Sequence, residues 1–299
     1  MDKTQLIVIS PFLNEENNIS LFVEQLYKKT KNLNLLFKII LIDDGSTDDS
    51  WSILKKISSK YKNLNCLKLL DNVGKDKAIL EAIKYALNKY QCEKFLLIDS
   101  DFEHPIDLID NFISESISKE LVVGIRKKTN TSLLRAMYSK FFYYLFNFLS
   151  KKKIVFNTTD YQLFNDRIAK ILVRIEDNPI IKIETQYLCK SFSKVSFDVP
   201  SDIKHQSSYS FINLVGLALN FIVKYTAYPV KTVFYSSFIL FLFTLIIFII
   251  SFQFYNFSIF FILLTISFAI IAILITQGFI LLSLSNSKDR QIIIEDKIE

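Results

Sequence analysis

Two aspartates separated by one residue follow a short apolar run near the end of the first third of the chain. Asp99 and Asp101 come directly after the run FLLI at residues 95–98, which has the composition of a buried strand. If the backbone stays extended past that strand, its period of two turns both carboxylates to the same side. Mg²⁺ is commonly held by one or two carboxylates together with substrate phosphates. The pair therefore predicts a divalent-cation site for a phosphorylated substrate, with two solvated turn aspartates as the alternative.

Other apolar runs also end in polar residues, and helix-like segments alternate with them. Strands are predicted near residues 6–9, 37–42, 64–69 and 95–98, and helices near 17–29, 50–61 and 76–90. This alternation indicates an α/β domain with a Rossmann-like, mostly parallel sheet and helices on both faces. In such sheets ligands bind beyond the carboxyl ends of the strands. We therefore expect a binding site formed by residues 11–15, 43–46, 71–75 and 99–101.

Two phosphate-binding patterns are absent from the sequence. Neither GxGxxG nor GxxxxGK[ST] occurs, so hydride transfer and ATP hydrolysis lack their usual sequence support. Asp43 and Asp44 admit two interpretations. The Asp-Gly-Ser sequence here is ordinary turn chemistry, but a carboxylate at this position could also accept the imide N–H of a uracil ring.

The charge distribution changes abruptly after residue 231. The chain is 51% hydrophobic with a mean hydropathy of +0.28, and residues 232–287 contain no Asp, Glu, Lys or Arg. Because one bilayer crossing needs about 20 residues, two membrane spans are expected, near residues 233–252 and 259–282. Basic residues flank the pair, so the positive-inside rule places both termini in the cytoplasm, as in an inner (plasma) membrane protein. The alternative is a hairpin buried in a soluble protein, but a domain of this size has no room to enclose one.

A basic and aromatic segment precedes the membrane region. Residues 121–159 contain no acidic residue, and their lysines and arginines interleave with aromatic side chains at residues 132–150. This pattern predicts an interfacial helix lying among membrane lipids. Nucleic-acid binding is the rival interpretation, and the adjacent spans argue against it. The expected organisation is a catalytic domain at 1–200, a juxtamembrane segment at 201–231, a two-helix hairpin at 232–287 and a cytoplasmic tail at 288–299.

Four sequence segments occur in a characteristic order. They are PFLNEENNI at residues 11–19, IDDGSTD at 42–48, NVGK at 72–75 and DSDFEHP at 99–105. The set resembles the family 2 inverting glycosyltransferases, and among them the dolichol-phosphate mannosyltransferase-like and bacterial polyprenyl-phosphate glycosyltransferases with a two-span C-terminal hairpin. The resemblance covers about residues 5–230 and implies a GT-A fold.

The resemblance also implies roles for individual residues. A nucleotide-sugar donor would be bound by Pro11, Glu15, Asp43, Asp44, Gly74, Lys75, Asp99 and Ser100. Mg²⁺ or Mn²⁺ on the donor diphosphate would be held by Asp99 and Asp101, with Glu103 nearby. Asp160, Asp101 and Arg126 match catalytic positions, and Arg126, Arg135 and Ser139 match positions that bind the acceptor phosphate. His104 is expected to pack within its turn.

The sequence departs from the family pattern on the donor-sugar and acceptor side. Gln162 stands where many relatives have Arg, and Glu103 where many have Gln. The expected reaction is transfer of a sugar, from a UDP-sugar, to polyprenyl phosphate at the cytoplasmic leaflet during cell-surface glycan assembly. The alternatives are a lipid-linked growing glycan of the O-antigen type as acceptor, or a catalytically degenerate membrane scaffold. The expected partners are donor, acceptor and membrane lipids, without nucleic acid, and the oligomeric state is left open, a homo-oligomer included.

Overall fold

The computed structural model describes residues 2–127, 154–155, 158–175, 180–198 and 294–298, together with Tyr144 and scattered helical positions from 265 to 280. The chain divides into two compact units. The first contains residues 1–132, 154–205 and 290–299, and the second contains residues 133–153 and 206–289. The sheet and the candidate site both belong to the first unit.

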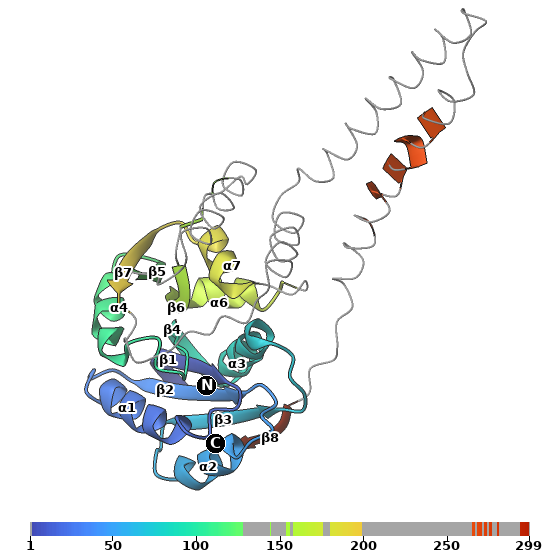
Figure 1. The fold of residues 1–299 in the computed structure, drawn as a ribbon. Helices are drawn as coiled ribbons and strands as arrows, with labels where there is room; N and C mark the ends of the chain where they lie inside the picture. Colours follow the sequence, from blue (N-terminus) through green and yellow to red (C-terminus); the bar gives the residue numbers. More distant parts are fainter. Residues whose placement is uncertain are drawn as a thin grey trace, which may run out of the picture. The chain divides into compact units, whose positions relative to one another are not determined.

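An eight-stranded sheet runs through the first unit in the order β7-β5-β6-β4-β1-β2-β3-β8 (Figure 1). Its strands are β1 (Asp2–Phe12), β2 (Phe37–Asp43), β3 (Leu64–Leu69), β4 (Tyr90–Leu97), β5 (Leu121–Arg126), β6 (Thr158–Asn165), β7 (Phe192–Phe197) and β8 (Ile294–Ile298). The helices are α1 (Ile19–Lys31), α2 (Ser50–Ser58), α3 (Lys75–Lys89), the short 3-10 helix η1 (Ile106–Leu108), α4 (Ile109–Glu115), α6 (Asp166–Leu172) and α7 (Ile181–Leu188).

Strand direction is mixed. Strands β3, β2, β1 and β4 are mutually parallel, and β7 is parallel to β5. Strand β6 lies between β4 and β5 and is antiparallel to both. The predicted α/β class with a Rossmann-like sheet is therefore confirmed.

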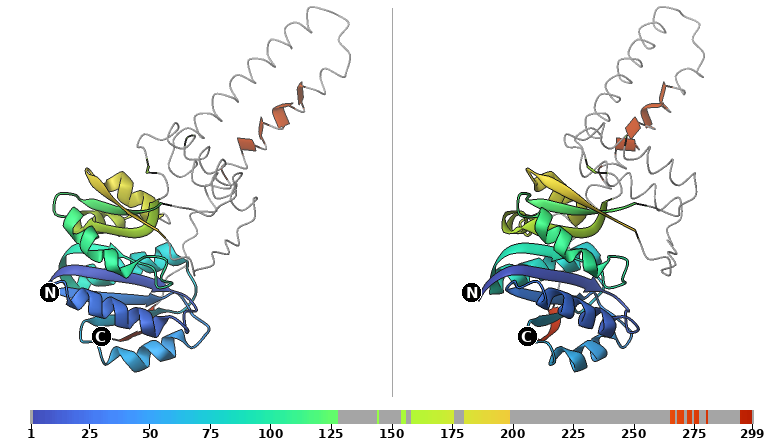
Figure 2. Two further views of the ribbon diagram at one scale, coloured as in Figure 1. Left: turned by 60° about the vertical axis from the view of Figure 1, so that its left-hand side comes forward. Right: turned by 90° about the vertical axis from the view of Figure 1, so that its left-hand side faces the viewer.

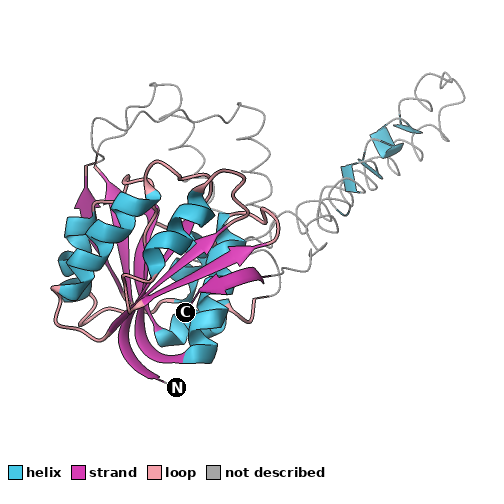
Figure 3. Ribbon diagram, turned by 90° about the horizontal axis from the view of Figure 1, so that it is seen from below, coloured by secondary structure: helices cyan, strands magenta, loops and turns pink. Residues whose placement is uncertain are grey.

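Alternating side chains divide the core into two layers. In β1, Leu6 and Val8 pack on one face, whereas Ile7 and Ile9 pack on the other. Helices α1, α2 and α4 cover the first face, and α3, α6 and α7 cover the second (Figures 2 and 3). Burying one such aliphatic side chain contributes about 1.5–3 kcal/mol. Because both faces are covered, the central strands are continuous apolar runs, which makes them recognisable in the sequence.

Strand β8 lies at the edge of the sheet, antiparallel to β3. Its register pairs Ile298 with Cys66 and Asp296 with Lys68. Residues 288–299 were expected to form a cytoplasmic tail, whereas residues 290–299 belong to the first compact unit. A five-residue strand of mixed composition carries little signal, and the edge of β3 supplies its hydrogen-bonding partner. The chain thus returns to the sheet of the first unit after residue 289.

The predicted membrane segments fall largely outside the described residues. Among the residues that the structure describes, none forms a helix long and apolar enough to cross a bilayer. Three predicted segments lie outside the described residues: 132–150 (Tyr144 excepted), 201–231 and 233–252. Of the second predicted span, 259–282, the structure describes only scattered helical positions. The interfacial helix and both spans therefore stay predictions.

The turn after β2 makes a close backbone approach that only glycine permits. Gly45 has φ of +78°, and a Cβ there would stand 2.6 Å from the backbone nitrogen of Asn72. Gly74 has φ of +94°, but a Cβ there would meet no atom within 4 Å. Gly45→Ala is therefore expected to lower the free energy of unfolding by about 2–4 kcal/mol, through strain plus the clash, and Gly74→Ala by about 1–3 kcal/mol, through strain alone, since its ψ of 145° lies in a region that almost only glycine adopts. Urea denaturation measures both, and equal losses would contradict this account of Gly45.

Candidate active site

A cleft of about 330 Å³ opens at the carboxyl ends of β1, β2 and β4. Its lining includes eight residues expected from the sequence, namely Pro11, Glu15, Asp44, Gly74, Lys75, Asp99, Ser100 and Asp101. The neighbouring Phe12, Leu13 and Asn72 also line the cleft; they lie within the expected strand-end segments 11–15 and 71–75, but no individual role was predicted for them. Parallel strands bring their following loops together at one edge, which is why positions far apart in the sequence converge here.

The loops after β1 and β2 are bonded to each other. The Asn14 N–H donates to Ser46 Oγ (2.9 Å), and the Thr47 N–H donates to Asn14 Oδ1 (2.9 Å). The Glu15 N–H donates to Ser50 Oγ (2.7 Å). Asn14 holds a left-handed φ of +55°, which Asn tolerates better than most residues. These contacts fix one wall of the cleft and give the Asp-Gly-Ser turn a structural role.

The two adjacent aspartates after β2 have different environments. Asp44 Oδ1 accepts the Val73 N–H (2.9 Å) and Oδ2 accepts the Gly74 N–H (3.1 Å), so Asp44 holds the loop before α3. Asp43 is fully buried outside the cleft lining, and its Oδ1 accepts the Ser46 N–H (2.8 Å). Asp43 Oδ2 has no hydrogen-bond partner among the described residues. Burial raises the pKa of both carboxyls.

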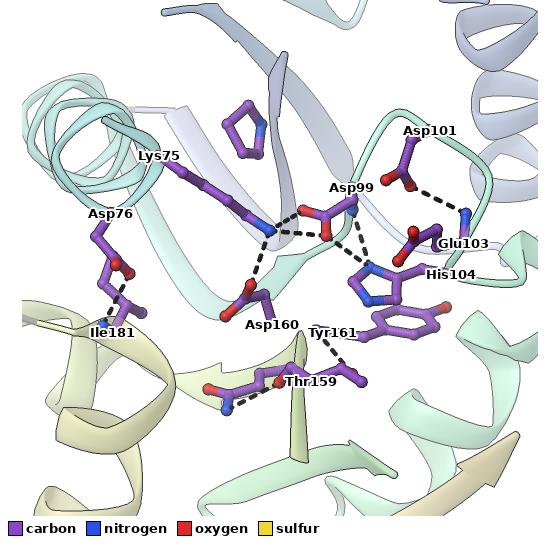
Figure 4. Close-up of polar contacts among 12 residues, drawn as sticks. Lys75, Asp76, Asp99, Asp101, Glu103, His104, Thr159, Asp160, Tyr161 and Ile181 are labelled. Carbon is purple, nitrogen blue, oxygen red and sulfur yellow. Dashed lines mark hydrogen bonds and ion pairs between the residues drawn. The ribbon is translucent and has the colours of Figure 1, made fainter. Parts of the chain in front are cut away.

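Lys75, the first residue of α3, joins two carboxylates (Figure 4). Its Nζ lies 2.6 Å from Asp99 Oδ1 and 2.8 Å from Asp160 Oδ2. Burial alone would lower the pKa of Lys75, but the charges of Asp160 and Asp99 raise it above its ordinary value. Burial would likewise raise the pKa of Asp160, yet the cations of Lys75 and Lys182 hold it well below its usual range. Lys75 and Asp160 are therefore both charged at neutral pH.

Strand pairing and a buried histidine position the two carboxylates. Leu97 of β4 pairs with Gln162 of β6, and continuing that antiparallel register by two residues sets Asp99 opposite Asp160. The Asp99 N–H donates to His104 Nδ1 (3.1 Å), and the His104 ring stacks on Tyr161 with centroids 5.0 Å apart. Burial lowers the pKa of His104, in keeping with the acceptor role of its Nδ1. His104 thus packs within its turn and supports Asp99.

The predicted metal residues are not gathered into a preformed site. Among the described residues, no group of three or more His, Cys, Asp or Glu side chains is arranged to hold a metal ion. Asp99 faces Lys75, and Glu103 pairs with Arg126. Asp101 differs, because its Oδ1 accepts only the Glu103 backbone N–H (3.0 Å) among the hydrogen bonds of the described residues.

The environment of Asp101 disfavours its ionised form, and a bound cation would offset that effect. Burial raises its pKa, and the neighbouring charges of Asp99 and Glu103 add to that effect. Mg²⁺ needs only one or two carboxylates when substrate phosphates supply further oxygens. The residues present therefore fit a divalent cation held by Asp101 together with a diphosphate, rather than by three carboxylates at once.

Gln162 has a role that the sequence did not reveal. Its side chain is fully buried, its Oε1 accepts the Thr185 hydroxyl (2.7 Å), and its Nε2 donates to the Lys182 carbonyl (3.2 Å). These bonds tie β6 to α7. The position held by Arg in many relatives thus serves internal packing here, which only the buried location of the side chain shows.

Comparison with known proteins identifies the family to which this chain belongs. Residues 7–172, from β1 to the end of α6, match the family described as glycosyl transferase family 2, which is more than half of the chain. The protein is a family 2 glycosyltransferase. Within this glycosyltransferase, Arg135 and Ser139, which were expected to bind the acceptor phosphate, lie outside the described residues.

Named relatives and a solved structure resemble this glycosyltransferase. "Uncharacterized glycosyltransferase YkoT" of Bacillus subtilis (strain 168) is 28% identical over 249 residues, covering 79% of this chain and 72% of the relative. "Undecaprenyl-phosphate 4-deoxy-4-formamido-L-arabinose transferase" of Pectobacterium atrosepticum is 24% identical, covering 77% and 70%. Glucosyl-3-phosphoglycerate synthase from Mycobacterium tuberculosis, solved with Mn²⁺, UDP-glucose and phosphoglyceric acid, matches with a TM-score of 0.50 and 15% identity over 74% of this chain and 78% of that one. That likeness concerns the fold alone and agrees with the GT-A expectation.

Asp76 beside the site joins two helices. It follows Lys75 in α3, and its carboxylate accepts the N–H of Ile181, the first residue of α7 (3.0 Å; Figure 4). Burial, with the nearby charge of Asp160, raises the pKa of Asp76 from 3.8 to about 6. The folded state therefore favours the protonated form. The resulting stabilisation is fully present below about pH 4 and is lost as the pH rises through about 6.

Asp76→Asn keeps a hydrogen-bond acceptor and removes the charge. The variant is expected to raise the free energy of unfolding at about pH 8 and to change it little at about pH 4. Urea denaturation at a series of pH values measures this. Asp76→Ala is the control, because it also removes the acceptor for Ile181 and should destabilise the protein. A wild-type protein as stable as Asp76→Asn at about pH 8 would refute the assignment.

Proposed function

We propose that this glycosyltransferase is a membrane-bound inverting enzyme that transfers a sugar from a nucleotide-sugar, with a UDP-sugar expected, to polyprenyl phosphate at the cytoplasmic leaflet. The observation that carries the proposal is the cleft in which Lys75 and Asp101 present a cation and a cation-binding carboxylate to one space. A diphosphate donor requires both kinds of partner. Family membership supports the reaction class, and the relative named as an undecaprenyl-phosphate transferase supports the acceptor.

The donor would lie across the loops that line the cleft. Asp43 Oδ2 is a buried acceptor without a partner among the described residues, and because Asp43 lies outside the cleft lining, its proposed bond to the imide N–H of uracil requires the turn at residues 44–46 to move. Asp44 would act indirectly, since it holds the Val73–Gly74 backbone against the nucleotide side of the cleft. A divalent cation on Asp101 and the donor phosphates would neutralise the leaving diphosphate.

The proposed reaction is a direct displacement. An ionised phosphate oxygen of the acceptor attacks the anomeric carbon while the bond from that carbon to the donor diphosphate breaks. The nucleophile is already charged, so no general base is needed, and the protein supplies positioning and charge stabilisation. Asp160 orients Lys75 rather than taking a proton. Arg126, Arg135 and Ser139 are proposed to hold the acceptor phosphate.

A transfer assay tests this proposal. The full-length protein in detergent is supplied with undecaprenyl phosphate and a panel of radiolabelled UDP- and GDP-sugars, with Mg²⁺ or with EDTA. One donor should give a labelled glycolipid that EDTA abolishes. Asp101→Asn should lower kcat/KM by about 100-fold or more, because charge stabilisation of the leaving group is lost. Asp107→Asn, an exposed carboxylate in η1 outside the cleft lining, is the matched control and should retain activity.

The other outcomes identify the alternatives. Donor binding or slow hydrolysis without a polyprenyl product, followed by transfer to a lipid-linked oligosaccharide, would assign a growing glycan as acceptor. Neither binding nor turnover across the whole panel would refute the enzymatic proposal and favour a degenerate scaffold.

The proposed location is the inner (plasma) membrane, with two spans and a cytoplasmic catalytic domain. The uncharged stretch at residues 232–287 supports the spans. Pairing of β8 with β3 supports the topology, because residues before and after that stretch belong to one compact unit and so require an even number of crossings. The basic residues between 126 and 153 would attract anionic headgroups, each contributing about 1 kcal/mol.

Two matched cysteine substitutions test the topology. Asn256 lies between the predicted spans and Asn286 lies after the second. In intact cells, a membrane-impermeant maleimide should label Asn256→Cys, and it should label Asn286→Cys only after permeabilisation. Labelling of Asn286→Cys in intact cells, or protection of Asn256→Cys, would overturn the two-span arrangement.

A further inference from the structure

Acidic side chains outnumber basic ones in the lining of the cleft. Among the residues that line it, Glu15, Asp44, Asp99 and Asp101 are acidic, and Lys75 is basic. Lys75 Nζ contacts both oxygens of Asp99, at 2.6 and 2.7 Å, and Asp160 Oδ2 at 2.8 Å. The ammonium group therefore occupies the coordination space of the first carboxylate of the Asp-Ser-Asp sequence.

Binding a divalent cation and the Lys75 ammonium group to the same Asp99 carboxylate costs free energy. Two cations beside one carboxylate repel each other strongly in a partly buried site. The side chains of Asp99 and Asp160 are 16% and 30% exposed, so water screens the repulsion only in part. Asp160, on the neighbouring strand, offers Lys75 a second partner that is not among the predicted metal residues.

We propose that Lys75 is an internal counter-ion that competes with a divalent cation for Asp99. When the cation binds Asp101 and Asp99, Lys75 leaves Asp99 and stays paired with Asp160. The freed N–H groups of its ammonium then face the donor diphosphate. This inference rests on the proposed function, because it requires a metal and a diphosphate in the cleft.

The exchange makes metal and donor binding cooperative. The metal releases Lys75 from Asp99, and the donor phosphates give the released ammonium group a new partner. By linkage, the donor must raise the affinity for the metal by the same factor as the metal raises the affinity for the donor. Asp160 is in this scheme a positioning residue that limits how far Lys75 can move.

The test is the affinity of the full-length protein for Mn²⁺ alone, measured by electron paramagnetic resonance of free Mn²⁺ without nucleotide. Lys75→Gln should bind Mn²⁺ about tenfold more tightly than wild type, because the competitor is gone. Lys75→Arg keeps the charge and should stay near the wild-type value. Lys84→Gln, which removes a lysine on the same helix that pairs with Glu81, is the matched control and should not change Mn²⁺ affinity. Adding Asp101→Asn to Lys75→Gln should abolish the gain, which places it in this cleft.

Unchanged or weaker Mn²⁺ binding by Lys75→Gln would overturn the proposal, since a lysine that merely supports the site gives that result. If Lys75→Gln fails to fold, an experimental structure of the wild-type protein with Mn²⁺ and UDP decides. Lys75 Nζ should then lie beyond salt-bridge distance of Asp99 and within it of Asp160, and an ammonium group still on Asp99 beside a bound Mn²⁺ refutes the exchange. Neither measurement involves an acceptor or turnover, so failure of the transfer assay and failure of this inference are separate results.

Discussion

One ammonium group shared by two carboxylates organises this site. Lys75 Nζ lies within hydrogen-bond distance of both Asp99 and Asp160, which arrive from neighbouring strands. On an open surface such a pair contributes about 0–1 kcal/mol, but in a partly buried cleft a carboxylate that loses its partner is costly to keep charged. The helix α3, the strand β6 and the loop after β4 that carry these three side chains are therefore constrained together, although each belongs to a different part of the chain.

Each member of the bridge has its own support. Asp44 accepts two backbone N–H groups from the loop before α3, so the helix begins where it places Lys75 against the cleft. His104, packed on Tyr161, holds the backbone of Asp99. Strand β6 pairs antiparallel with β4, which places Asp160 opposite Asp99. His104 and Tyr161 are buried behind the site, whereas Asp44 both holds the loop before α3 and lines the cleft.

The sequence predicted the fold class and the cleft better than it predicted the contacts inside the cleft. Buried parallel strands are continuous apolar runs, and their ends are marked by residues such as Asp43 and Asp99, so β1 to β4 and the edge where ligands bind were recognisable. A motif does not show which opposite charges pair. Lys75 and Asp160 are 85 positions apart, and their contact depends on the strand order. For the same reason the sequence grouped Asp99, Asp101 and Glu103, whereas the structure distributes them among Lys75, a backbone N–H and Arg126.

Strand β8 has a consequence for how the protein is made. Its partner β3 is completed at Leu69, and the residues that cover that edge begin only at Ile294. At synthesis rates of about 5–20 residues per second, the edge of β3 emerges roughly 10–50 s before its covering strand exists. During that interval the nascent domain carries an unpaired strand edge that invites pairing with other chains. This edge of the sheet is thus covered only after residues 206–289 have been synthesised.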